Sequence, residues 1–339
     1  MKSRHVIIPI FVPHKGCPND CIFCNQKKIS GQMEEITPEM IPEIIESHLA
    51  TIENSAFVEV AFYGGSFTAI DRTLQENLLK EAYEYVKSGR VSEIRLSTRP
   101  DCIDEDILEM LKKYGVRTIE LGVQSLDDEV LRASCRGHNA ACVYESSELI
   151  KRKGFRLGIQ TMTGLPGDTR EKALRTARQV ISISPEIVRI YPVLVIKGTA
   201  LEMLYLGGKY APMALEDAVK LCAELLELYE KHDINVIRIG LQATENIRSG
   251  AESDVAAGPE HPAFRQLVES ELARRRIEAL IKERGLAGSK SLLINTGASN
   301  ISNVVGQRRA NIDYFKSKYN IDRIKVMDDG SGTAEISIE

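Results

Sequence analysis

The sequence predicts an α/β protein built as a partial barrel, followed by a small α+β extension. Two observations predict this fold. Apolar strand-like runs alternate with amphipathic helical stretches over about the first 240 residues, and polar or glycine-rich segments follow the ends of these runs. A barrel of this kind commonly takes about 200–250 residues. The 339 residues of the chain therefore leave room for one small appendage.

Six strand–helix units follow one another along the chain. Alternation of this kind implies parallel strands joined by right-handed crossovers, so we expect a partial (βα)6 barrel of the TIM type. A doubly wound open sheet would give the same local pattern and stays an alternative. The expected strands and helices are, in order, 6–13 with 37–49, 58–63 with 71–86, 93–98 with 104–113, 118–123 with 140–153, 156–161 with 170–183, 187–193 with 215–232, and a last strand at 235–239.

The polar segments after the strands indicate where the functional site lies. In a barrel, the loops that follow the strands converge on one rim. We therefore expect the chemistry of this protein at that rim. The segments cover residues 14–24, 64–68, 98–101, 124–125, 164–167 and 191–198.

The alternation ends near residue 250, where glycine, serine and proline residues mark a change. We place a domain boundary there, with the barrel over 1–245 and an extension over 246–339. Between residues 265 and 325, 13 Lys and Arg stand against 6 acidic residues, a net charge of +7 that suits a phosphate-bearing partner. The expected elements of the extension are helices at 263–284 and 310–318 and strands at 292–294, 323–326 and 333–338.

Composition excludes several classes of protein. The chain has 44 Lys and Arg against 48 Asp and Glu, and 43% of its residues are hydrophobic, which excludes a disordered chain and a wholly basic nucleic-acid coat. The apolar stretch 6–12 is far shorter than the roughly 18–20 residues of a membrane helix. We find no cleavable leader and expect a cytoplasmic protein without a membrane partner.

Three of the seven cysteines fall within eight residues, in the spacing C-x-x-x-C-x-x-C formed by Cys17, Cys21 and Cys24. Three thiolates on one loop can bind three irons of a cubane cluster and leave the fourth iron open to a small molecule. A zinc site is the alternative, because His14 would supply a fourth soft ligand.

The sequence resembles the radical S-adenosylmethionine (SAM) enzymes, and within them the radical-SAM domain of the Elongator catalytic subunit. Beyond the cysteines, five blocks carry this resemblance in the expected order, over residues 6 to about 245. They are FYGGSFT at 62–68, TRPD at 98–101, ELGVQS at 120–125, RGH at 136–138 and IYPVLVIKGT at 190–199.

The resemblance implies that Cys17, Cys21 and Cys24 hold a [4Fe–4S] cluster whose open iron binds SAM. Reductive cleavage of SAM would then give a 5′-deoxyadenosyl radical that acts on a substrate, with an RNA base, in particular of transfer RNA, favoured. The implied electron donor is a reduced flavodoxin or ferredoxin. Two alternatives stay open: a small-molecule substrate, as in oxygen-independent coproporphyrinogen oxidase, and a zinc-stabilised binding module without catalysis.

The resemblance also assigns residues around SAM. Gly64 and Gly65 would bring bare backbone to its ammonium group, although an ordinary turn explains them as well. Ser66 is either a ligand contact or a helix cap. The other predicted contacts are Gln124 and Ser125 at the ribose and carboxylate, Arg99 or Arg136 at the carboxylate, and Gln160 near the adenine.

Each of these assignments has a structural alternative. For Arg99 and Arg136 the alternative is an ion pair with Asp101 or Glu120, and for the polar strand ends it is hydrogen bonding within the protein. Tyr191 and Lys197 stand where a substrate would enter, and we assign them to catalysis, with a purely structural role as the alternative.

Two features limit the resemblance. The Elongator catalytic subunit also has an acetyltransferase domain, and the residues after 250 are too few for one, so we expect no acetyl-CoA. Residues 304–326 are similar to a KH RNA-binding unit, but Arg309 takes the place of the second glycine of its backbone-clamping loop. The extension is thus expected to be KH-like or to close the barrel.

Overall fold

The computed structural model describes residues 5–12, 21–25, 35–52, 56–241, 253–331 and 333–338. Contacts within the chain divide it into two units. Unit 1 comprises residues 1–213 with 229–260, and unit 2 comprises residues 214–228 with 261–339. The boundary at 245 stays a prediction. His14 and Cys17 lie outside the described residues.

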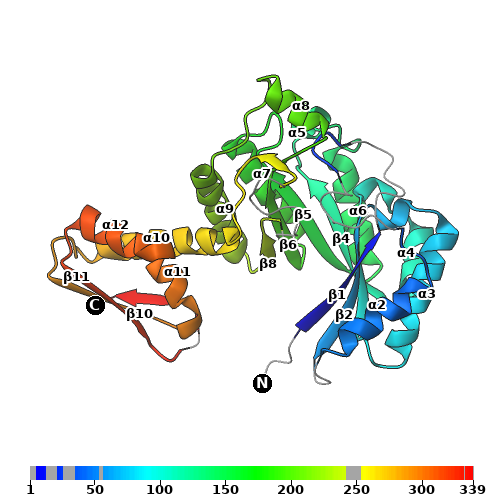
Figure 1. Cartoon of the computed structure of the whole chain (residues 1–339), viewed down its shortest axis with the longest axis horizontal. Helices are drawn as coiled ribbons and strands as arrows, with labels where there is room; N and C mark the ends of the chain where they lie inside the picture. Colours follow the sequence, from blue (N-terminus) through cyan, green and yellow to red (C-terminus); the bar gives the residue numbers. More distant parts are fainter. Residues whose placement is uncertain are drawn as a thin grey trace. The chain divides into compact units, whose positions relative to one another are not determined.

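Unit 1 is built on a curled sheet of seven parallel strands in the order β1-β2-β3-β4-β5-β6-β8 (Figure 1). The order follows the chain without a reversal, which excludes the doubly wound alternative. Among the described strands the two ends of the sheet do not pair, so the barrel is partial, as predicted. The strands are β1 (His5–Val12), β2 (Phe57–Gly64), β3 (Glu93–Thr98), β4 (Val116–Gln124), β5 (Arg156–Thr163), β6 (Ile187–Pro192) and β8 (Asn235–Ile239).

Helices follow the strands and cover the outer face of the sheet (Figure 1). Side-chain caps set the first turn of four of them, at Asp71, Asp104, Asn139 and Thr169. The helices are α2 (Met40–Leu49), α3 (Arg72–Lys87), α4 (Glu105–Lys113), α6 (Ala140–Arg152) and α7 (Arg170–Ile183), and α9 (Leu215–Glu230) carries residues of both units.

The sequence did not predict several short elements at the rim. These elements lie in loops of unit 1, outside the strand–helix repeats. They are helices α5 (Asp128–Ala133) and α8 (Ala200–Leu206) and the antiparallel pair of strands β7 (Val195–Ile196) and β9 (Val255–Ala257). They are too short to give a periodic pattern.

Unit 2 has its own core. Three helices, α10 (Phe264–Glu283), α11 (Ile301–Val305) and α12 (Ala310–Tyr319), pack with a three-stranded sheet of order β11-β10-β12. Strand β10 (Ser291–Thr296) is parallel to β11 (Arg323–Asp328) and antiparallel to β12 (Ile336–Ile338). Ile277, Phe315 and Ile294 are fully buried at the centre. In the described ranges, no helix is long and apolar enough to cross a membrane.

Candidate functional site

The second half of the cysteine loop is held at the rim of unit 1 by backbone hydrogen bonds. Ile22 donates to the carbonyl of Ser134 at 3.2 Å, and Leu201 donates to the carbonyl of Ile22 at 2.8 Å. These bonds fix the loop between the end of α5 and the start of α8. Cys21 is buried and Cys24 is half-buried.

Two arginines from different loops face the sulfur of Cys21. Nη1 of Arg136 lies 3.4 Å from Sγ, and Nη1 of Arg99 lies 4.0 Å from it. Both side chains are buried, with 6% and 2% of their surface exposed. Buried cations favour a sulfur that carries negative charge, as a metal-bound thiolate does.

Arg99 is fixed by an ion pair, one of the alternatives the sequence left open. Its Nε and Nη2 each donate to a carboxylate oxygen of Asp101 at 2.8 Å, and Nη2 also donates to the carbonyl of Arg136 at 2.6 Å. Burial alone would raise the pKa of Asp101, but the Arg99 guanidinium holds it below its ordinary value. The pair therefore stays charged at neutral pH.

The guanidinium of Arg136 makes fewer hydrogen bonds than that of Arg99. Its Nη2 donates to the carbonyl of Gly122 on β4. Its Nε is buried without a hydrogen-bond partner among the described residues. The guanidinium therefore keeps one donor for another group.

Gln124 ends β4 in an unusual conformation. Its φ is +69°, and the N–H of Ser125 donates to the carbonyl of Val123 at 2.9 Å across it, which makes a tight three-residue turn of the rarer, strained kind. The turn brings the Gln124 side chain to Gln160 on β5, whose Nε2 donates to Oε1 of Gln124 at 2.7 Å. Strain of this type concentrates at functional sites.

The loop after β2 is hydrogen-bonded to the backbone of Arg99 and also follows the end of β1 closely. Gly64 has a φ of +109°, and a Cβ there would lie 3.0 Å from the carbonyl oxygen of Val12. Gly65 donates to the same oxygen at 3.0 Å. The hydroxyl of Ser66 contacts Thr98 at 2.8 Å and accepts from the N–H of Arg99 at 3.2 Å. Ser66 makes no side-chain cap, so the capping alternative is wrong.

Most of the predicted cofactor residues thus form one connected group on the ends of β2 to β5. Ser125 points elsewhere, since its hydroxyl contacts Thr176 and the N–H of Asp127. Tyr191 on β6 contacts Arg189 at 3.5 Å. Lys197 follows β7, and its backbone N–H donates to the backbone carbonyl of Asp254 at 2.8 Å. Among the described residues, its ammonium makes no contact with the connected cofactor residues.

Sequence reasoning missed a buried charge network inside the barrel. Glu120 on β4 accepts from Arg95 on β3 at 3.2 Å and from Arg189 on β6. Arg189 also donates to the hydroxyl of Tyr63 on β2 at 2.8 Å, and β2 is not a neighbour of β6 in the sheet, so the two meet across the concave face. Burial raises the pKa of Tyr63 to about 12, which keeps it a neutral donor. The signal in the sequence was charge within otherwise apolar strands.

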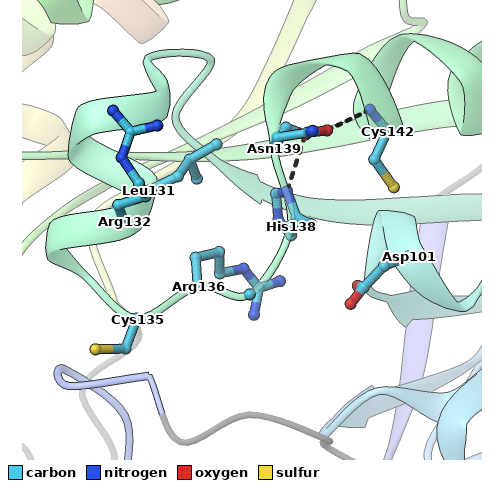
Figure 2. A pocket seen from close by; sticks show the side chains of 9 residues that line it. Asp101, Leu131, Arg132, Cys135, Arg136, His138, Asn139 and Cys142 are labelled. Atoms are coloured by element: carbon cyan, nitrogen blue, oxygen red, sulfur yellow. Dashed lines mark hydrogen bonds between the residues drawn. The ribbon is translucent and has the colours of Figure 1, made fainter.

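A pocket of about 620 Å³ lies beside Arg136, lined also by Asp101, Cys135 and Cys142 (Figure 2). His138 stands at its wall, with Nδ1 at 3.3 Å from the carbonyl of Asn139. Burial, reinforced by the Arg136 guanidinium, lowers the pKa of His138 to about 4, so the ring is neutral at neutral pH.

Comparison with models of protein families shows to which family of proteins the chain belongs. The model of the radical SAM superfamily matches residues 11–180, half of the chain, and the model of the radical SAM C-terminal domain matches residues 185–274. The chain belongs to the radical SAM superfamily. It is therefore an enzyme of that superfamily, as the resemblance of its rim motifs implied.

Two relatives and one solved structure show further similarity to the chain. The tRNA uridine(34) acetyltransferase of Dehalococcoides mccartyi is 26% identical over 72% of the chain and 63% of that protein. Human Elongator complex protein 3 is 31% identical over 50% of the chain and 35% of that protein. The chain thus spans less than two thirds of each. The structure of Elp3 from Methanocaldococcus infernus superposes with a TM-score of 0.62 over 84% of the chain and 64% of that structure at 21% identity, which shows the shared fold.

Membership of the superfamily implies SAM and a [4Fe–4S] cluster, and the described residues fit both groups. Cys21 and Cys24 supply two sulfur ligands on one fixed loop, and buried guanidiniums face the sulfur of Cys21. The Nε of Arg136, which has no hydrogen-bond partner in the described part of the chain, offers a donor of the kind that binds a carboxylate.

Proposed function

We propose that the chain binds a [4Fe–4S] cluster through Cys17, Cys21 and Cys24, cleaves SAM reductively, and acts on a base of RNA, with transfer RNA as the substrate. The contact between Arg136 and Cys21 carries the proposal. It joins the cysteine loop to the strand ends at which the predicted SAM residues lie.

The cluster, when bound, supplies the electron that splits SAM into methionine and a 5′-deoxyadenosyl radical. The residues of the chain bind and orient SAM. Arg136 is the better partner for its carboxylate, because Arg99 already binds Asp101 through two hydrogen bonds. Arg99 is then a positioning residue that holds the backbone of Arg136.

The remaining residues divide into two groups. The half-buried backbone at Gly64 and Gly65 would receive the ammonium group of SAM, and the paired amides of Gln124 and Gln160 would contact its nucleoside half. Ser66 would support this group through Arg99, and Ser125 would contact SAM only if its hydroxyl turned from Thr176. On the substrate side we propose Tyr191 and Lys197.

The choice of RNA is supported by the names of the relatives, which include transfer-RNA-modifying proteins. The electron donor we propose is a reduced flavodoxin or ferredoxin, since cleavage of SAM needs one electron. The small-molecule alternative gains no support of its own from the described residues.

Analysis of the modified nucleosides of transfer RNA tests whether transfer RNA is the substrate. A strain that lacks the gene is compared with its parent by mass spectrometry, and we expect one modified nucleoside to disappear. The wild-type gene and a Cys135→Ala variant should restore the nucleoside, because Cys135 is an exposed thiol outside the cysteine loop, whereas Cys24→Ala should not. An unchanged nucleoside profile in the deletion strain would contradict the RNA substrate.

A further inference from the structure

The last part of unit 2 follows the order strand, helix, turn, helix, strand (Figure 1). Strand β10 leads to α11, residues 306–309 form the turn, and α12 leads to β11, which lies parallel beside β10. In KH units, a Gly-x-x-Gly loop clamps the backbone of bound nucleotides. Here the turn between the two helices reads Gly-Gln-Arg-Arg, and it follows the residues matched by the family models.

The first residue of the turn must be glycine. Gly306 has φ +75° and ψ 158°, a region that essentially only glycine adopts. A Cβ there would lie 3.0 Å from the backbone nitrogen of Asn311. The buried Asn311 amide donates to the carbonyls of Ser270 and Asn303 at 3.0 and 3.1 Å, which fixes the base of the turn.

The last two residues of the turn are both left-handed. Arg308 has a φ of 51° and Arg309 a φ of 68°. Arg309 takes the place of the second glycine of the KH loop, and it adopts a conformation that glycine adopts at low cost. The arginine that weakened the sequence resemblance therefore adopts a left-handed conformation that is open to glycine at the same position.

Both arginines of the turn are exposed, and neither guanidinium has an ion pair within the described part of the chain. This separates them from five other cations of unit 2, which carboxylates neutralise. The neutralised pairs are Arg265 with Glu269, Arg274 and Arg275 with Glu271, and Lys282 and Lys318 with Glu278. The turn thus presents two adjacent free guanidiniums on a fixed backbone.

We propose that turn 306–309 binds the phosphate backbone of single-stranded RNA through Arg308 and Arg309. Guanidinium groups match phosphate oxygens in bidentate geometry. Two such groups held next to each other suit successive phosphates of one strand. The choice of RNA over another polyanion rests on the proposed function, whereas the anion-binding turn rests on the geometry of unit 2 alone.

The chain offers a matched control on the same unit. Arg323 and Lys325 lie on the edge strand β11, are exposed, and have no ion pair among the described residues. Ile324 and Val326, which alternate with these two residues along β11, pack against the core of unit 2. Since side chains alternate along a strand, Arg323 and Lys325 point to the face opposite the helices. Their replacement removes the same charge from another surface.

The test measures binding of a fluorescein-labelled 12-nucleotide single-stranded RNA to the full chain by anisotropy over a series of salt concentrations. For R308A/R309A we expect affinity to fall by about tenfold or more and the slope of log K against log salt to lose about 1.4, because each phosphate contact on a single strand contributes about 0.7. R323A/K325A should keep both values close to those of the wild type. R308A/R309G is a second variant that keeps the turn, since glycine adopts the left-handed conformation without strain.

Equal losses in the turn variants and in R323A/K325A would overturn the proposal, because binding would then reflect net charge alone. Undiminished affinity in R308A/R309G would also overturn it, as would equally tight binding of a polyglutamate peptide that competes with the RNA. Formation of 5′-deoxyadenosine without RNA is measured on the same proteins. If SAM is cleaved but the wild type does not bind RNA, this inference fails while the SAM chemistry stands.

Discussion

Nη1 of Arg136 lies 3.4 Å from the sulfur of Cys21, and Nη2 of the same guanidinium donates to the carbonyl of Gly122. One buried side chain therefore links the cysteine loop to the end of β4. Gln124, the central residue of the strained turn, lies two residues after Gly122 on that strand. This link explains how residues more than 100 positions apart in the chain are held at one point of the rim.

Replacement of Arg136 by alanine should reduce the rate of SAM cleavage by about 10- to 100-fold, because hydrogen bonds to charged groups contribute about 1.5–3 kcal/mol. Production of 5′-deoxyadenosine by the reconstituted protein measures this rate. The control is Arg132→Ala, an exposed arginine that lines the same pocket. A rate within twofold of the wild type for Arg136→Ala would remove Arg136 from the SAM site.

Replacement of Glu120 by glutamine should destabilise unit 1 by about 3–5 kcal/mol, since it leaves the buried Arg189 without its balancing charge. Arg95 keeps its ion pair with Glu59 at 2.9 Å. Urea unfolding followed by circular dichroism gives the value. Glu105, whose pair with Lys153 is on the surface, provides the control, and Glu105→Gln should leave the stability nearly unchanged. Similar small losses in both variants would mean that the interior network adds no stability.

The main elements of the fold could be predicted because their patterns are long and regular. The helix expected at 263–284 is observed at Phe264–Glu283, and the strand expected at 93–98 is observed at Glu93–Thr98. The choice between a barrel and a doubly wound sheet could not be made from periodicity, since both give alternating elements. Strand order decides it, and that depends on contacts between distant residues.

The candidate site could be predicted as a set of residue types but not as a set of contacts. The sequence placed Arg99 and Arg136 near SAM, and the structure adds that Arg99 is already bound to Asp101. It did not indicate that Glu120 and Arg189 meet inside the barrel, because a charged residue in a strand is read locally as a solvent-facing position. Such pairs arise only when the sheet curls.

Replacement of Gly64 by alanine should destabilise unit 1 by about 1–3 kcal/mol, because Gly64 has a φ of +109° and its Cβ would press on the carbonyl of Val12. Thermal unfolding of the apo protein measures the loss. Gly89 also has a positive φ, but open space surrounds the position of its Cβ, so Gly89→Ala should cost less. A Gly64→Ala protein as stable as the wild type would show that the loop after β2 relaxes freely.

Unit 2 should lose stability in acid through Glu278. Burial would raise the pKa of this carboxyl, but hydrogen bonds from Lys318 and Tyr319 outweigh burial and lower the pKa to about 2 from its ordinary value of 4.5. The unfolded chain therefore takes up the proton first as pH falls. The contribution of Glu278 is complete above about pH 5 and is lost between about pH 4.5 and pH 2.

Amide hydrogen exchange of α12 measures this loss in the wild type and in Glu278→Gln. At pH 7 we expect the variant to be less stable by about 1–2 kcal/mol, since each pKa unit corresponds to about 1.4 kcal/mol and solvent around the exposed Lys318 screens part of the interaction. Its protection should depend less on pH. Glu283→Gln, at an exposed position of the same helix as Glu278, is the control. Identical pH profiles for the wild type and Glu278→Gln would show that this carboxyl does not couple to folding.

Anaerobic reconstitution with iron and sulfide tests the central claim most directly. The account predicts a brown protein with about four irons per chain that converts SAM to 5′-deoxyadenosine when dithionite reduces it. Cys24→Ala should lose both properties, and Cys142→Ala, at a thiol on α6, should keep them. A colourless protein that holds one zinc per chain and leaves SAM intact would contradict the account.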